Sequence, residues 1–194
     1  MTESAGAPDY DALPPPPADA PHGAALLARL VDGLAFRYRW AADGLAPEDL
    51  GFEPAPEALT LGGLLEHLHD LAAWMATSAA AARAGTDAPP YAEARAAHPP
   101  PAGDPEALRR STLALLASLR GDLLALGDDG LARFALVGGR EPTRWPVWNL
   151  LNGPLADSLT HVGQLASWRR MLGKPVPRHD VFRGRPPRPA SDGS

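Results

Sequence analysis

The distribution of proline constrains this chain more than any other feature of its sequence. The 23 prolines among 194 residues gather in a few stretches, and between them apolar residues recur at helical spacing. Proline lacks a backbone donor and clashes with the preceding helical turn, so helix interiors rarely contain it. The chain is therefore predicted to fold as helices joined by long, proline-rich connections.

Four segments carry the helical pattern. The predicted helices cover residues 22–43, 60–84, 104–126 and 143–172. Thr60 and Asp104 are suitable N-cap residues for the second and third helices. Pro154 is expected to kink the last helix or to mark its restart. In this last helix the buried stripe is predicted to contain Val147, Leu151, Leu155, Ser158, Val162 and Leu165.

The remaining segments are predicted to be connections and ends. Residues 85–104 are expected to form a loop, and Phe134–Val137 a short extended segment that two glycines and a proline keep from growing into a sheet. Residues 1–21, with six prolines, and the basic tail 176–194 are expected to be disordered. The fold class is thus all-α, a single four-helix bundle over residues 22–175.

Charge argues against two kinds of partner. Residues 169–194 carry a net charge of +5 and the rest of the chain −10, so the acidic body is a poor binder of a phosphate backbone and no nucleic-acid partner is expected. No apolar run approaches the roughly 18 residues that a membrane span requires. The acidic beginning of the sequence does not resemble a signal peptide. A cytoplasmic protein with no membrane partner is expected.

The chain has no cysteine, so any metal must be held by His, Asp or Glu. Asp157 and His161 lie one turn apart on a second stripe of the last helix, beside its buried face. A carboxylate and an imidazole at this spacing can point at the same ion. Taken alone, such a pair is more often a simple hydrogen bond on the helix surface.

The second helix offers two possible partners for that pair. His67 and His69 lie on opposite edges of its leucine stripe, so only one of them can face the same site. Periodicity does not choose between them. His67 shares its edge with Trp74, and either histidine could instead be hydrogen-bonded at the margin of the bundle.

These residues resemble a known family. The segment from His67 to Trp74, and the sequence His161-x-Gly163-Gln164-Leu165 followed by Arg169-Arg170 and Gly173-Lys174-Pro175, are similar to the DinB-like superfamily of small four-helix-bundle metalloproteins over residues 25–175. The resemblance implies metal ligands at His67, position 157 and His161. Asp157 stands where the family has histidine. Two imidazoles and one carboxylate suit Zn, Ni, Mn or Fe(II) and leave positions open for water or substrate.

Two further side chains are candidates for orienting the ligands. Gln164, one turn after His161, could position that imidazole or a bound water, or be a surface amide. Asp70 could accept the second N–H of His67, or be a solvated charge. Trp74 and Trp168 flank the ligands and could belong to the core, to a substrate platform, or to both.

Two classes of function follow from these residues. The resemblance implies a metal-dependent enzyme for a small-molecule substrate, either a hydrolase or a transferase that uses an external thiol. The alternative is a non-catalytic helical bundle, a binding or stress-associated protein whose metal is structural or absent. No GxSxG, P-loop or GxGxxG motif is present. The resemblance also implies a homodimer, which Trp40 or Trp148 could anchor.

Overall fold

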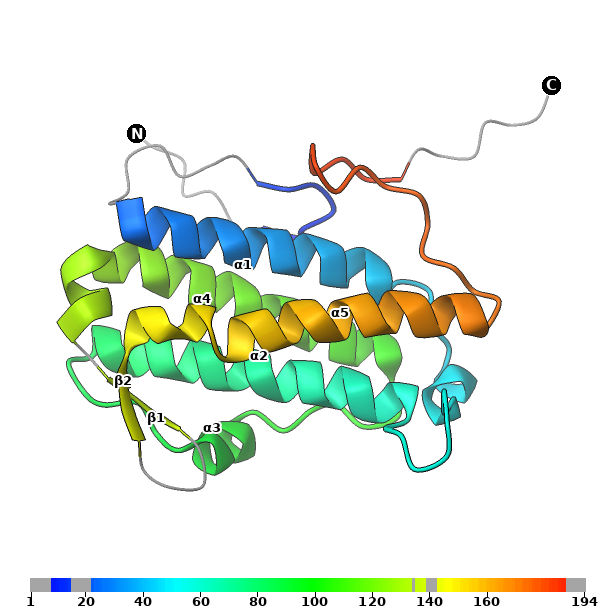
Figure 1. Cartoon of the computed structure of the whole chain (residues 1–194), viewed down its shortest axis with the longest axis horizontal. Helices are drawn as coiled ribbons and strands as arrows, with labels where there is room; N and C mark the ends of the chain where they lie inside the picture. The colour runs from blue at the N-terminus through cyan, green and yellow to red at the C-terminus, as the bar shows by residue number, and fades with distance from the viewer. Residues whose placement is uncertain (1–7, 15–21, 134, 139–142, 188–194) are drawn as a thin grey trace.

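The computed structural model describes residues 8–14, 22–133, 135–138 and 143–187 (Figure 1). Within these residues the fold is all-α apart from one small hairpin. The elements, in chain order, are α1 (His22–Ala41), the 3₁₀ helix η1 (Pro47–Gly51), α2 (Leu61–Arg83), α3 (Tyr91–Ala97), α4 (Pro105–Arg133), β1 (Ala135–Gly138), β2 (Thr143–Pro146), the 3₁₀ helix η2 (Val147–Leu151) and α5 (Pro154–Met171).

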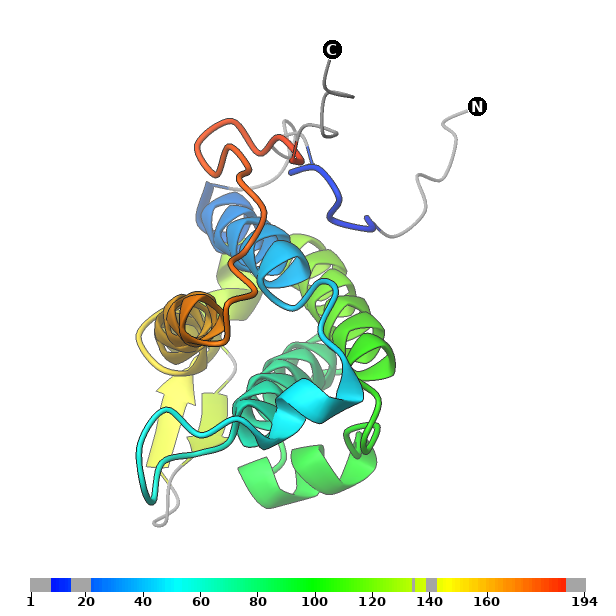
Figure 2. The same ribbon diagram turned by 90° about the vertical axis from the view of Figure 1, so that its right-hand side faces the viewer.

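Four long helices pack around one core. α1 contacts α4, α4 contacts α2, α2 contacts α5, and α5 contacts α1, so the contacts close into a ring. Figure 2, seen along the helices, shows this arrangement. The core between them is apolar and includes Leu27, Val31, Leu34, Leu64, Leu65, Leu68, Met75, Leu116, Leu119, Leu123, Leu155, Val162 and Leu165. The predicted all-α class and the mutual packing of the long helices are confirmed. None of the helices in the described part of the chain is long and apolar enough to cross a membrane.

α2 begins as its sequence predicts. The Thr60 side chain accepts a hydrogen bond from the Gly63 backbone N–H at 3.0 Å, which satisfies one of the free donors of the first turn. The leucine stripe that follows is buried, with Leu61, Leu64 and Leu65 all at 0% exposure. The burial of this stripe turns it toward the core, and α2 packs against both α4 and α5.

α4 continues past its predicted end at Leu126. Gly127 adopts a φ of 67°, a left-handed conformation that breaks the helix, and one further turn follows up to Arg133. That turn carries Asp128, whose Oδ1 accepts the Ala24 backbone N–H at 2.8 Å. The early turns of α1 lack an acidic residue of their own, so Asp128 supplies the missing acceptor.

The hairpin and η2 correct the prediction for residues 134–153. β1 and β2 pair antiparallel, so the extended segment does grow into a two-stranded sheet. The last helix does not begin at 143–146 but restarts at Pro154, because Gly153 has non-helical dihedral angles (φ −95°, ψ −110°). In the intervening 3₁₀ helix, Leu150 is buried and Leu151 is 49% exposed, contrary to the stripe expected for a continuous α-helix.

α3 is a helix that the sequence did not predict. It occupies residues 91–97, inside the expected loop, with Pro90 directly before it and prolines soon after. Its only buried apolar side chain is Ala94. Seven residues with so little apolar periodicity give no helical signal, and packing against α2 holds the element in place.

Parts of both expected disordered ends lie against α1. In the segment 8–14, Tyr10 is completely buried and the Leu13 N–H donates to the Gly184 carbonyl at 2.9 Å. In the segment 176–187, the His179 ring packs edge-on against Phe36 with centroids 5.5 Å apart. The other residues of the predicted leader and tail, 1–7, 15–21 and 188–194, lie outside the described part of the chain.

Arg169 ties α5 to the end of α1, and its replacement tests that connection. Its guanidinium donates to the carbonyls of Ala41 at 2.9 Å and Asp43 at 2.6 Å, and to that of Lys174 at 2.8 Å. Arg169→Met leaves these acceptors without a donor, so we expect the free energy of unfolding to fall by about 2–3 kcal/mol. Urea denaturation monitored by circular dichroism measures the change.

The neighbouring arginine, Arg170, provides the control because its side chain is exposed. Arg170→Met is expected to change the free energy of unfolding by less than about 0.5 kcal/mol, as is usual for a surface substitution. Equal losses in the two variants would contradict a specific role for Arg169.

Candidate metal centre

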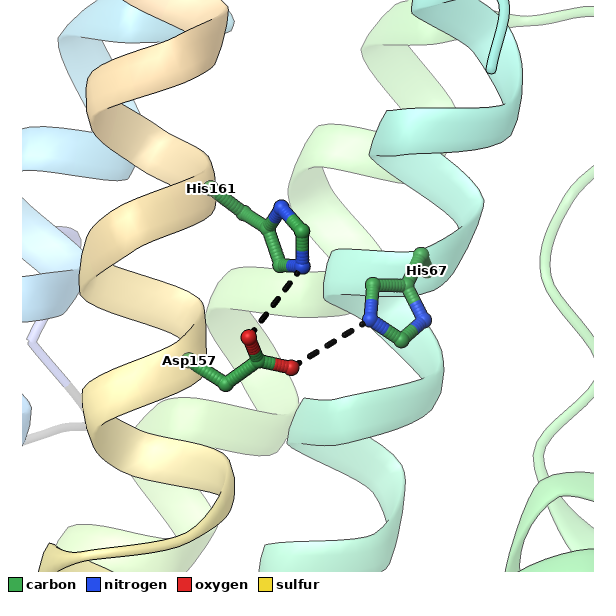
Figure 3. A group of neighbouring side chains, drawn as sticks. All are labelled: His67, Asp157 and His161. Atoms are coloured by element: carbon green, nitrogen blue, oxygen red, sulfur yellow. Dashed lines mark ion pairs between the residues drawn. The ribbon is translucent and has the colours of Figure 1, made fainter. Parts of the chain in front are cut away.

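Three side chains from two helices converge on one point of the surface. His67 extends from α2, and Asp157 and His161 extend from α5 toward it (Figure 3). His67 Nε2 lies 3.5 Å from Asp157 Oδ2, and His161 Nε2 lies 3.3 Å from Asp157 Oδ1. One potential ligand atom from each residue lies within 4.8 Å of the other two. The group could hold a metal ion.

The packing of α2 against α5 selects His67 rather than His69. His69 is 1% exposed and points toward α4, where its Nε2 lies 2.9 Å from Ser111 Oγ. His67 lies on the opposite edge of α2, and its ring is 4.8 Å from that of His161, edge to face. The choice that periodicity left open is therefore made by the neighbouring helices.

The donor set suits a divalent cation in its chemistry, and its three ligand atoms lie within 4.8 Å of one another. Ligand atoms about 2.0–2.1 Å from a zinc ion at tetrahedral angles lie about 3.3–3.4 Å apart. The distances from Asp157 to the two imidazoles, 3.3 Å from Oδ1 and 3.5 Å from Oδ2, are each close to that separation. Two neutral imidazoles and one carboxylate would leave a divalent ion with one net positive charge and with further positions for other ligands.

Gln164 contacts the nitrogen of His161 that faces away from Asp157. Gln164 Oε1 lies 2.8 Å from His161 Nδ1. Since an amide oxygen only accepts, Nδ1–H donates to it. In the neutral ring the lone pair is then on Nε2, directed at the Asp157 carboxylate. A lone pair and a carboxylate repel each other unless a proton or a metal ion lies between them. The predicted contact between Gln164 and His161 is present, and it leaves Nε2 facing Asp157.

The site is open to solvent on one side. The side chain of Asp157 is 48% exposed, that of His67 33%, and that of His161 17%. A structural metal site is usually closed by four protein ligands, whereas this group offers three and remains accessible. A small molecule can therefore approach the three side chains.

Asp70 does not serve the role expected from the sequence. It is 3% exposed, not solvated, and its Oδ2 forms an ion pair with Arg95 Nε of α3 at 2.9 Å; no hydrogen bond with His67 is found among the described residues. Burial raises the pKa of Asp70, and the charges of Arg95 and His67 oppose that rise. The carboxylate instead holds α3 against α2.

α3 in turn brings an aromatic side chain close to the site. The Tyr91 ring packs edge-on against Trp74 with centroids 5.6 Å apart. Burial, followed by the negative charge of Asp70, raises the pKa of the Tyr91 hydroxyl, and the charge of Asp157 adds to the effect. Tyr91 therefore remains a neutral hydroxyl near two carboxylates, and no pattern in the sequence singles it out.

An apolar pocket of about 300 Å³ adjoins Asp157. It is lined by Leu71, Trp74, Trp145, Asn149, Gly153, Pro154 and Asp157. Trp74 thus faces a cavity, as one of its alternatives proposed, whereas Trp168 is partly buried against the core. Trp145 and Asn149 were missed because only the hairpin and η2 bring them beside α5.

Comparison of the chain with models of protein families, with curated proteins and with solved structures finds no match. A metal site is therefore supported by geometry alone. The chain is a helical protein with a His-His-Asp group that could bind metal.

The burial of His69 leads us to expect that stability depends on pH, an effect that does not involve the candidate metal centre. Burial lowers its pKa to about 4, from an ordinary value of 6.5. In the unfolded chain His69 binds a proton below pH 6.5, whereas in the folded protein it does so only below about pH 4. The free energy of unfolding is therefore unaffected by His69 above pH 6.5 and decreases as the pH falls from 6.5 to 4. The loss is about 3 kcal/mol at most.

The variant His69→Gln removes the titration and keeps a partner for Ser111. We expect its stability, from urea denaturation at pH 7 and pH 4.5, to fall less than that of the parent. His22→Gln, at an exposed histidine, is the control and should follow the parent. Parallel losses in parent and His69→Gln would show that other groups cause the acid sensitivity.

Proposed function

We propose that this chain is a metal-dependent enzyme of the DinB-like type that acts on a small-molecule substrate, as a hydrolase or as a transferase using an external thiol. The observation that carries the proposal is the convergence of His67, Asp157 and His161 from two helices within 4.8 Å. The open side of the group and the adjoining pocket support catalysis rather than a purely structural metal.

The donor set suits Zn, Ni, Mn or Fe(II), and such an ion would supply Lewis acidity toward water, a thiol or a substrate oxygen. The protein's own residues have separate tasks. Gln164 holds the His161 ring so that Nε2 faces the site, and Asp157 supplies the negative charge. The pocket beside Asp157, with the indoles of Trp74 and Trp145, receives an apolar part of the substrate and excludes water from it.

The alternative is a non-catalytic bundle that binds a partner or responds to stress, with a structural metal or none. It predicts that metal removal leaves every binding activity in place, or that the stable protein contains no metal. Screening the metal-loaded and chelator-treated protein against ester, amide and thiol-transfer substrates separates the two, because only the enzyme loses turnover on chelation.

The expected homodimer and the cytoplasmic location stay predictions. Of the two proposed anchors of a dimer, Trp40 is covered by its own chain: its indole N–H donates to the Asp11 carbonyl at 3.2 Å, and Arg39 and His179 lie against its ring. Trp148 is 50% exposed and is the better candidate.

Loss of any one ligand should weaken metal binding. Protein purified without added metal is analysed for bound elements, stripped with a chelator, and titrated with Zn²⁺ and Mn²⁺ by calorimetry. We expect the dissociation constant to rise by roughly 10- to 100-fold or more for His67→Ala, Asp157→Ala and His161→Ala. Asp157→His, which supplies a third imidazole, should retain binding.

Matched controls test whether the effect belongs to the site. His22→Ala and Asp129→Ala remove an exposed histidine and an exposed carboxylate elsewhere in the bundle, and both should bind metal like the parent. If Asp157→Ala binds as tightly as the parent, Asp157 is not a ligand and the two-histidine, one-carboxylate site is wrong.

Gln164 should affect metal binding only through His161. Gln164→Ala frees the imidazole to rotate and to change tautomer, so we expect affinity to fall by roughly tenfold. Gln164→Glu keeps an oxygen acceptor for Nδ1–H and should restore most of the affinity. Equal affinities of Gln164→Ala and the parent would contradict an orienting role.

A further inference from the structure

A second cavity lies on the other side of α5 from the candidate metal centre. Its volume is about 570 Å³. Cavities of this size accommodate small molecules. On α5 its lining includes Leu159, Gly163, Ala166 and Arg170, spaced four, three and four residues apart, so they share one face. Asp157 and His161 lie on the opposite face of the same helix, which makes the two sites independent.

The chain after α5 forms the far wall of this groove. Figure 2 shows it leaving the end of α5 and rising beside α1. The His179 ring, packed against Phe36, attaches this wall to α1. A reciprocal pair of backbone hydrogen bonds between Asp180 and Arg185, both 3.1 Å, closes the turn that follows. The wall is thus attached to α1 by one aromatic contact and closed on itself by a pair of backbone hydrogen bonds.

The groove combines an apolar floor with a basic rim. Leu159, Val162 and Ala166 of α5 face Val176 and Val181 of the wall. Arg37, Arg170 and Arg178 lie around this floor, and no acidic residue is among the lining side chains. The lining is therefore complementary to a molecule with an apolar body and a negatively charged head.

These three arginines share a property with few others in the described residues. Most arginines in the described residues form an ion pair, and Arg169 is held by backbone carbonyls. Arg37, Arg170 and Arg178 have no carboxylate within ion-pair distance in the described part of the chain, and Arg37 donates only to the Gly33 carbonyl at 2.9 Å. In a chain of net charge −5, three unpaired cations around one apolar cavity are a site prepared for an anion.

We propose that this groove binds an amphiphilic anion, a small carboxylate or phosphate monoester with an apolar tail of about ten carbons. The tail lies on the valines and alanine of the floor, and the head group is held by Arg170 and Arg178 at the rim, where guanidinium groups bind carboxylate and phosphate oxygens. Neither the metal nor the proposed reaction is needed for this binding.

Calorimetric titration with decanoate tests the proposal. Decanol carries the same tail without the charge and acetate the charge without the tail, so we expect both to bind at least tenfold more weakly than decanoate. Decyl phosphate is titrated in the same way. If either anion binds more tightly than decanol, the site is supported, and the anion with the lower dissociation constant identifies the preferred head group. Equal binding of decanol and decanoate would overturn the proposal, as would no binding of either anion.

Variants locate the binding in the groove. Gly163 is exposed, and a Cβ added to it would meet no other atom within 4 Å, so Gly163→Leu fills the cavity without disturbing the helix and should abolish binding. Gly121→Leu, an equally open position on α4, is the matched control and should bind like the parent. Binding that survives Gly163→Leu would place the ligand elsewhere and refute the assignment.

The arginines are tested in the same way. Arg170→Gln and Arg178→Gln should each weaken decanoate binding by five- to tenfold. Arg183→Gln, in the same segment but paired with Asp180, should leave it unchanged. Equal effects of all three substitutions would show that the anion is attracted by the overall positive charge of the segment after α5, and not by the groove. Metal titration should give the parent's value in every one of these variants, so failure here leaves the metal site untouched.

Discussion

The packing of α2 inside the bundle is the constraint on which the other features depend. Its leucine stripe contacts α4 and α5, and α3 and η1 also pack against it. With so much of its surface covered, α2 has one open edge, and His67 and Trp74 lie on that edge. The His-His-Asp group and the pocket beside it exist because α5 approaches this edge at the level of Asp157.

α2 also carries a buried carboxylate, Asp70, that connects it to α3. Asp70 is almost completely covered and forms an ion pair with Arg95, a contact that joins α3 to α2. An isolated carboxylate in such a position would be costly, and the guanidinium offsets part of that cost. The consequence for the site is indirect: α3 brings Tyr91 against Trp74, and so fixes one wall near the metal ligands.

The sequence predicted the parts of the structure that depend on local periodicity. The four long helices, the Thr60 cap and the Asp157–His161 spacing all follow from residues a few positions apart. What could not be predicted depends on distant contacts. His69 is excluded from the site by Ser111, 42 residues away, and Trp145 reaches the pocket only through a hairpin between segments with little strand character. The ion pair of Asp70 with Arg95 was not foreseen, because the short helix that covers Asp70 has almost no apolar signal.

Backbone groups at the two ends of α1 form hydrogen bonds with side chains that come much later in the chain. Asp128 accepts an N–H near its beginning from 104 residues away, and Arg169 binds the carbonyl at its end from 128 residues away. Contacts of such long sequence separation form slowly, because the loop between them must close first. During synthesis on the ribosome α1 is made before α4 and α5, so its contact with Asp128 must wait for α4 and its contact with Arg169 for α5. α1 therefore gains the contacts at its two ends only after the later helices of the bundle have been made, and its segment must remain competent to fold until then.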